Sequence, residues 1–497
     1  MDRTQKAIVI GSGIGGIATA GILARKGYKV VLFEKNSGFG GRCGSISRDG
    51  HRFDTGATFL MMPGAYEELF AALGKDLHKE LKLFRMDPIY SLRYANGNRI
   101  DFTSDLHKLQ EQFESIEPGS YGRFLKLLAT GYWTYKDSMK LINRNYDTVL
   151  DPSLLTFPLK MLRYKAFHDQ YRYISRIFKS EELRALFTFQ NLYMGQNPMK
   201  ASGIYHQLPF MELSDAVYFP EGGMGMVAEK LLEAAVELGV EAIGGAPVQK
   251  INVEKNRANG VFLKDGTFHE ADLVVANADL PFVYREMLPA GRKSKKLDKL
   301  NYSCSAMVFH WAVDTVFPQL GQHTVFVSDQ NKEACRTIFE EHSDAASPSI
   351  YVHSPVRSDR TAAPAGHDSL TAIVHTGRIT RENGVDWTAL KERTRNAILK
   401  RFEQEGMKDF EKHIKFEICY TPQHWSSVLN LTYGATFGSV GHNLLQMGFL
   451  RPGNQHKKYR NLFFVGGSTV PGSGVPLALS SAKLVTERIE KNAVPAS

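Results

Sequence analysis

The sequence predicts an α/β protein in which a domain built on a parallel sheet is joined to a second domain of mixed sheet and helices. Three observations lead to this prediction. A strand, a glycine-rich turn and a helix follow one another near the first residues, strands and amphipathic helices alternate through the middle, and a similar strand, turn and helix recur near the last residues. Because 497 residues exceed a single typical core, at least two domains are expected.

The first 56 residues have the pattern of a Rossmann-like dinucleotide-binding βαβ unit. A buried strand that starts at Lys6 leads into a glycine-rich turn and an apolar helix, and a second strand ends in Glu34. Glu34 and the next residue, Lys35, are both expected to bind the cofactor. Glycines in such a turn permit the tight bend, the approach of a pyrophosphate and the packing of the helix, whose amino terminus favours phosphate. The Glu34 carboxylate would accept a ribose hydroxyl and disfavour a 2′-phosphate. The turn residues expected to bind the dinucleotide are Gly11, Ser12, Gly13, Ile14, Gly15 and Gly16.

A second glycine cluster follows at 38–41 and is joined directly to Arg42. Gly41 would let backbone approach an anion closely, and the planar fork of an arginine matches phosphate oxygens. The alternative is a flexible loop with a solvated arginine.

A third cluster lies near the carboxyl end. A strand ends in Gly466 and Gly467, and a turn rich in glycine and proline, which contains Gly474 and Val475, opens a helix that runs to Glu490. Such a helix amino terminus favours negative charge, so in a flavoprotein it would face the N1–C2=O edge of the isoalloxazine and stabilise the reduced ring. The alternative is a purely structural turn. Together the clusters predict FAD bound by both ends of the chain.

The composition limits the classes of partner and the cellular setting that we expect. The formal net charge is +9 and the pI about 9.1, which favours an anionic surface; without a compact basic and aromatic RNA-binding pattern, that surface is expected to be a membrane and not nucleic acid. The four cysteines are far apart and have no CxxC spacing, so neither a zinc site nor a disulfide framework is implied and a reducing, cytoplasmic setting is expected. The uncharged run 7–24 is explained by the nucleotide motif, and no spanning helix is predicted.

The segment 143–180 mixes aliphatic, cationic and aromatic residues. This mixture suits a helix that lies in a membrane interface, although an ordinary amphipathic helix packed on its own domain explains it equally well. We expect the dinucleotide domain to be discontinuous, with a helical, membrane-associated substrate region and a substrate sheet inserted into it. The expected boundaries are 1–88, 218–300 and 431–497 for the FAD-binding domain, 89–217 for the helical substrate region and 301–430 for the substrate sheet.

These motifs together resemble the bacterial and fungal phytoene desaturase family of carotenoid enzymes, within the amine-oxidase-like flavoproteins. The resemblance spans nearly the whole chain in order, and its more specific pieces are residues 187–198 and 466–476. It implies FAD, a membrane-docked substrate domain and a polyene substrate. It also implies that Glu34 binds the adenosine ribose, Arg42 neighbours the pyrophosphate, the Val248 backbone meets the adenine, and Gly467 with the Gly474–Val475 turn lies against the isoalloxazine. The family often has histidine where this chain has Val470, so any proton-handling role of that histidine is absent here or the position is structural.

The chemistry implied by the resemblance is hydride transfer from an allylic carbon to flavin N5, with proton loss from the adjacent carbon. It requires neither a Ser-His-Asp arrangement nor a metal cluster, and neither stands out in the sequence. His310 on an apolar strand is expected to be a core histidine. The candidate proton acceptors or orienting residues are His206, Tyr205, Glu221 and Tyr218, each with a structural role as the alternative.

The leading expectation is an FAD-dependent carotenoid desaturase that acts on a C30 or C40 polyene such as phytoene, at the cytoplasmic face of a membrane, with a quinone or oxygen as electron acceptor. Within the class, the alternatives are a hydroxycarotenoid 3,4-desaturase, a carotenoid isomerase or oxygenase, and a retinol-saturase-like enzyme. The alternatives outside it are a soluble amine oxidase and a non-catalytic flavoprotein that escorts carotenoids.

Overall fold

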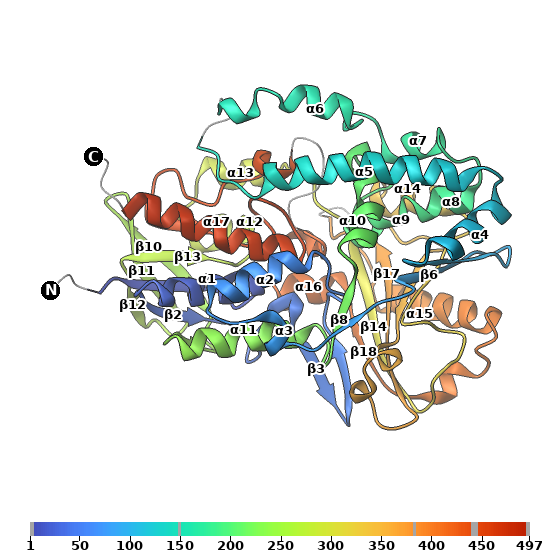
Figure 1. Ribbon diagram of the computed structural model, residues 1–497. Helices are drawn as coiled ribbons and strands as arrows, with labels where there is room; N and C mark the ends of the chain where they lie inside the picture. Colours follow the sequence, from blue (N-terminus) through green and yellow to red (C-terminus); the bar gives the residue numbers. More distant parts are fainter. Residues whose placement is uncertain (1–3, 148–150, 381–383, 439–445, 494–497) are drawn as a thin grey trace.

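The computed structural model describes residues 4–147, 151–380, 384–438 and 446–493. It confirms the predicted fold class: a lobe centred on a parallel sheet adjoins a lobe that combines a mixed sheet with helices (Figure 1). Residues 148–150, which belong to the predicted interfacial segment, lie outside the described residues.

The first lobe contains a five-stranded parallel sheet of order β19-β13-β1-β2-β9. Its strands come from both ends and the middle of the sequence, so this lobe is discontinuous. Alternate residues of β1 enter different cores: Ala7 and Val9 pack toward helices, and Ile8 and Ile10 pack toward a small antiparallel sheet. The strands are β1 (Lys6–Ile10), β2 (Lys29–Phe33), β9 (Glu241–Ile243), β13 (Leu273–Ala276) and β19 (Leu462–Phe464).

Burial on both faces explains why these strands have continuous apolar sequences. The longer helices whose residues share one core with the sheet are α1 (Ile14–Arg25), α2 (Pro63–Ala72), α11 (Gly225–Glu237) and α17 (Val475–Ala493). The antiparallel sheet on the other face comprises β10 (Val248–Glu254), β11 (Arg257–Leu263) and β12 (Phe268–Glu270).

The second lobe contains a seven-stranded sheet of order β18-β14-β17-β16-β15-β6-β7, in which only β15 and β6 pair in parallel among the described strands. Helix α15 (Trp387–Gln404) covers one face of this sheet. The strands are β6 (Tyr90–Arg93), β7 (Arg99–Phe102), β14 (Ser305–Val313), β15 (His323–Phe326), β16 (Ile350–His353), β17 (Asp368–Thr376) and β18 (Ile414–Tyr420).

Helices surround the other face of the second sheet. Gly119, which follows Pro118 and has φ of 76°, separates the first two of them. Among its described residues, the predicted interfacial segment contains two short α-helices, α6 and α7, and not one long helix. The first of them, α6, lies at the outer edge of the molecule beyond α5 (Figure 1). These helices are α4 (Leu106–Ile116), α5 (Ser120–Ile142), α6 (Phe157–Arg163), α7 (Gln170–Ser175), α8 (Glu181–Leu186), α9 (Phe189–Tyr193) and α10 (Leu208–Ser214).

Shorter elements connect the lobes, and β5 pairs with β8 between them.

All four cysteines are free, and among the described helices none combines the length and apolarity needed to cross a membrane. The remaining strands and α-helices are β3 (Ser45–Arg48), β4 (His51–Asp54), β5 (Leu83–Arg85), β8 (Tyr218–Pro220), α3 (Leu77–Glu80), α12 (Leu280–Phe282), α13 (Arg292–Leu297), α14 (Asn331–Phe339) and α16 (Pro422–Val428).

Candidate active site

The two glycine turns at opposite ends of the sequence meet in space beside Asn277. Strands β1, β13 and β19 are parallel neighbours, so the turns that follow them lie at one edge of the sheet. Asn277 follows β13 and donates from Nδ2 to the Gly11 carbonyl oxygen at 3.2 Å. A Cβ placed on Gly15 would lie 3.4 Å from the Gly466 Cα. The two turns therefore lie together in space, as predicted.

Crowding explains why the first turn needs glycine. A Cβ on Gly16 would lie 2.1 Å from the Gly11 carbonyl oxygen, and a Cβ on Gly13 would lie 2.7 Å from Asn277 Nδ2. Gly11 itself has φ of 93°, in the left-handed region that favours glycine. Helix α1 begins after Gly13 without a side-chain cap, which leaves its first backbone amides available to an anion.

Glu34 is held rigidly at the end of β2. Its buried carboxylate accepts hydrogen bonds from Ser12 N at 2.9 Å and Ser12 Oγ at 2.8 Å, and from Asn36 N at 2.9 Å and Asn36 Nδ2 at 3.1 Å. The neighbouring Lys35 donates to Asn430 Oδ1 at 2.8 Å, and burial lowers its pKa while the Glu34 charge opposes this. Ser12 therefore lies behind Glu34 and orients its carboxylate through these two hydrogen bonds.

We expect Glu34→Gln to weaken FAD binding about tenfold. The glutamine amide would place its own N–H donors against the donors of Ser12 and Asn36, which now surround the carboxylate. Flavin fluorescence during reconstitution of the cofactor-free chain measures this affinity. Glu241→Gln is the matched control, since Glu241 is exposed on the adjacent strand β9. Equal affinities for the two variants would show that Glu34 does not hold the ribose.

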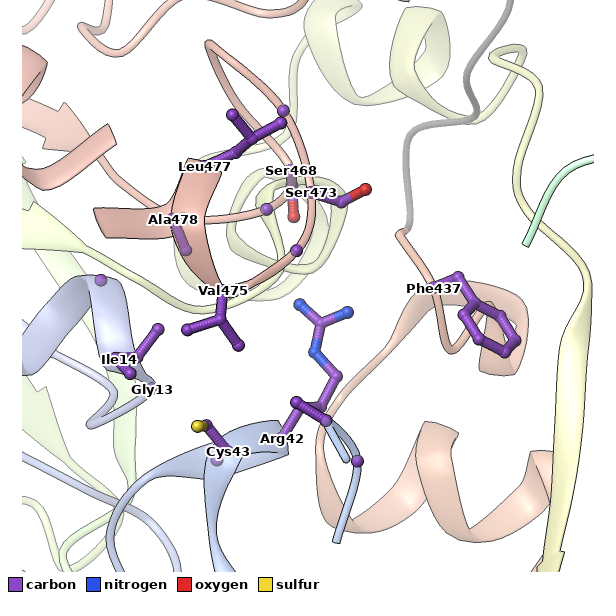
Figure 2. Close-up of a pocket in the computed structure, with 18 of the residues that line it drawn as sticks. Gly13, Ile14, Arg42, Cys43, Phe437, Ser468, Ser473, Val475, Leu477 and Ala478 are labelled. Carbon is purple, nitrogen blue, oxygen red and sulfur yellow. The ribbon is translucent and has the colours of Figure 1, made fainter. Parts of the chain in front are cut away.

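Arg42 brings a partly buried cation between the two turns. Its Nη1 donates to the Thr436 carbonyl oxygen at 2.9 Å, and a Cβ on Gly467 would lie 3.3 Å from its Nη2. Burial lowers the Arg42 pKa, and the charge of Asp279 opposes this. Figure 2 shows the guanidinium extending toward the loop that carries Ser468 and Ser473, with Ile14, Cys43 and Val475 on one side of it and Phe437 on the other.

One cavity of about 890 Å³ connects Glu34, Arg42 and the two glycine turns. The arrangement fits FAD: an uncapped helix terminus and Arg42 suit phosphates, Glu34 suits a ribose, and glycines leave room for close approach. Ser12 and Gly16 do not line the cavity, because Gly16 packs against Gly11 behind it. The predicted cofactor-binding residues that do line it are Gly11, Gly13, Ile14, Gly15, Glu34, Lys35, Gly41, Arg42, Val248, Gly466, Gly467, Gly474 and Val475.

Beyond the turns the cavity continues into a chamber, which we call the apolar chamber, between α5, α6, α9 and α10. Methionines are frequent on its wall, and their flexible thioethers adapt to irregular apolar surfaces. Phe157 and Met161 of α6 line it, so the chamber reaches the predicted interfacial segment. Its wall includes Met61, Met62, Tyr135, Met139, Ile142, Phe157, Met161, Tyr193, Met194, Ile204, Leu208, Met211, Met447 and Phe449.

Of the four proton-handling candidates, only Tyr205 lines the cavity. Its hydroxyl accepts a hydrogen bond from Gln196 Nε2 at 3.0 Å, and burial raises its pKa. His206 lies behind the wall, where Nδ1 contacts the Gly203 carbonyl oxygen at 2.7 Å and Nε2 contacts Thr134 Oγ1 at 3.2 Å, and burial lowers its pKa.

The other candidates lie away from the cavity. Glu221 accepts from Lys82 Nζ at 2.7 Å at the surface, and Tyr218 belongs to the short strand β8. His310 is a buried core histidine with Nδ1 3.0 Å from Thr371 Oγ1, as expected, and burial lowers its pKa to about 3. Val470 does not line the cavity, and its N–H donates to the Pro452 carbonyl oxygen at 3.1 Å.

Sequence reasoning missed a buried polar group beside the apolar chamber. Glu212 is 2% exposed and contacts Tyr90, Gln190 and Tyr193, which come from β6 and α9. One signal was available: Glu212 is a lone charge in the apolar run 208–213.

The flavin-containing amine oxidoreductase family model matches residues 14–490 of this chain. The zeta-carotene-forming phytoene desaturase of Myxococcus xanthus is 37% identical over 98% of this chain and 94% of its own length. The phytoene desaturase of Fusarium fujikuroi is 34% identical over 99% and 90%, and the 4,4′-diapophytoene desaturase (4,4′-diaponeurosporene-forming) of Staphylococcus aureus is 31% identical over 98% and 99%.

Solved structures share the fold at low identity. An oxidoreductase from Methanosarcina mazei aligns with a TM-score of 0.64 at 18% identity, covering 97% of this chain and 100% of its own. Wild-type putrescine oxidase bound to putrescine aligns with a TM-score of 0.63 at 15% identity, covering 99% and 100%. The cofactor is FAD and the chain is an oxidoreductase. The chain therefore belongs to the flavin-containing amine oxidoreductase family, in its phytoene desaturase branch.

Proposed function

We propose that this chain is a carotenoid desaturase that uses FAD to introduce conjugated double bonds into a C30 or C40 polyene such as phytoene. The observation that supports this most directly is the continuity of one cavity from the two glycine turns into the apolar chamber. A long apolar substrate would reach the flavin-binding turns without leaving apolar surroundings. The full-length similarity to phytoene desaturases supports the same substrate class.

The bound flavin supplies the hydride acceptor, and the protein supplies binding and orientation. In this proposal Glu34 holds the adenosine ribose, the amino end of α1 and Arg42 hold the phosphates, and the second turn lies against the isoalloxazine. The wall of the apolar chamber aligns the polyene and excludes water, which fixes the reacting carbons beside the ring. A quinone or oxygen would serve as the final electron acceptor.

We further propose that the protein docks on an anionic membrane through α6 and its flanks, at the predicted cytoplasmic face. The outward apolar side chains there are Leu155, Leu159, Leu162 and Phe167, which are 77%, 70%, 60% and 60% exposed. Phe157 and Met161 of the same segment line the apolar chamber. Cations beside an exposed apolar face suit an anionic lipid interface, and this arrangement would give a lipid-dissolved polyene a short path inward.

Product analysis in cells that make phytoene and contain only this desaturase tests the function. We expect products with longer conjugation, and a purified protein that is yellow from bound flavin. Anaerobic liposomes loaded with phytoene provide the second readout, in which the flavin absorbance bleaches as the polyene is oxidised. A flavin-loaded protein that leaves the polyene unchanged in both settings would contradict the proposal, and hydrogen peroxide production from a soluble amine would favour an amine oxidase.

A further inference from the structure

The buried carboxylate of Glu212 has an unusual environment. Glu212 on α10 accepts hydrogen bonds from the hydroxyls of Tyr193 at 2.9 Å and Tyr90 at 3.0 Å, and from Gln190 Nε2 at 3.2 Å. Gln190 Nε2 also donates to the Tyr90 hydroxyl oxygen at 2.8 Å. Each partner is a neutral side chain, so hydrogen bonds alone support the charge of the carboxylate.

Such a buried carboxylate is costly to keep ionised. Within the part of the chain that the structure describes, Glu212 has no ion pair, and the titratable groups that face it are Tyr90 from β6 and Tyr193 from α9. Burial raises its pKa to about 7, although the three hydrogen bonds oppose the rise. An apolar side chain would pack here at lower cost, and a carboxylate poised near neutral pH is suited to proton exchange.

Tyr193 connects this carboxylate to the cavity. It lines the cavity, whereas Tyr90, Gln190 and Glu212 do not. Its ring lies 5.8 Å from that of Phe59, which also lines the cavity.

The same region also contacts the wall beside Arg42. A Cβ on Gly195, two residues after Tyr193, would lie 2.4 Å from Phe437 Cβ, and Phe437 follows the Thr436 carbonyl that Arg42 holds. Tyr193 therefore lies where the apolar chamber meets the flavin-binding turns.

We propose that Tyr193 and Glu212 take up the proton that the polyene loses in each desaturation. This inference rests on the proposed function. One allylic C–H gives its hydride to the bound flavin; the adjacent C–H bond breaks, and its electron pair becomes the new double bond. That proton goes to the Tyr193 oxygen while the phenol passes its own proton to Glu212 Oε1. Tyr193 is the catalytic residue that meets the substrate, and Glu212 acts through it.

Two phenylalanine variants separate this role from a structural one. Tyr193→Phe and Tyr90→Phe each remove one hydroxyl from Glu212, at 2.9 Å and 3.0 Å, but only Tyr193 lines the cavity. We expect Tyr193→Phe to lower the desaturation kcat about 100-fold with little change in KM and in flavin content. Tyr90→Phe should lower kcat by less than about tenfold at high pH, because the proton path through Tyr193 remains.

The pH profile and an infrared titration complete the experiment. Since Glu212 must be ionised to accept a proton, kcat should fall below the pKa of about 7. In Tyr90→Phe this fall should move to higher pH, because that hydrogen bond favours the ionised form. The infrared absorption of a protonated carboxyl should titrate over the same range in the purified flavin-loaded protein, vanish in Glu212→Gln and return in Glu212→Asp.

The outcomes are distinguishable. A wild-type protein that oxidises no polyene would overturn the proposed function itself. An active wild type with equal losses in both phenylalanine variants, or without a carboxyl that titrates near neutral pH, would overturn the inference alone.

Discussion

Replacing Gly16 by alanine is expected to abolish FAD binding. The added Cβ would lie 2.1 Å from the Gly11 carbonyl oxygen and 3.0 Å from Asn277 Nδ2. Neither Gly11 nor Asn277 can move freely, because Asn277 bonds Gly11 and packs against both glycine turns. The turn must therefore shift away from the position that meets the phosphates. The ratio of flavin to protein absorbance should fall below about a tenth of the wild-type value.

Gly64→Ala is the matched control for this substitution. Gly64 occupies the first turn of α2, as Gly16 occupies the first turn of α1, and a Cβ there would have nothing within 4 Å. Alanine has the higher helix propensity, so the control should bind flavin normally and unfold at the same or a slightly higher temperature. Full flavin content in Gly16→Ala would mean that the turn accommodates the methyl group and that our interpretation, in which the turn requires glycine at position 16, is wrong.

The second large effect is expected at the membrane. Replacing both Leu159 and Leu162 by glutamate should reduce the affinity for anionic vesicles at least 100-fold. Burial of a leucine side chain contributes about 1.5–3 kcal/mol, so two of them contribute roughly 3–6 kcal/mol, and the new charges repel the lipid surface. Both side chains are mostly exposed, so the fold and the flavin content should not change. Cosedimentation with vesicles that contain anionic lipid measures the affinity.

Val236→Glu serves as the comparison. Val236 is 50% exposed on α11, in the parallel-sheet lobe (Figure 1). A charge there should leave vesicle binding unaltered. If the double leucine variant sediments with vesicles as the wild type does, α6 is not the docking surface, and its apolar face requires another partner.

The cofactor half of the site could be predicted because its requirements are local. The spacing of Gly11, Gly13 and Gly16 reflects steric limits within one turn, and the structure shows those limits as close approaches to Gly11 and Asn277. Helix α15 also carries a local signal at its start, since Asp386 accepts from Thr388 N and Ala389 N. No tertiary information is needed for either feature.

The substrate half could not be predicted in the same way. His206 and Glu221 were selected by residue type, yet the fold places one behind the cavity wall and the other at the surface. Conversely, the hydrogen bonds of Glu212 join α10 to β6 and α9, which only the folded chain brings together. The sequence indicates that Glu212 is an unusual charge, but its partners depend on tertiary assembly.

The order of strands in the parallel sheet also constrains how this protein can be made. Strand β13 pairs with β19, which is the last of the described strands, and α17 follows it. A chain that emerges from the ribosome amino end first would present β1 and β13 long before β19 could pair, with an apolar sheet edge exposed in the interval. Flavin loading would then follow translation, and production of this enzyme would depend on chaperones that shield the unfinished sheet.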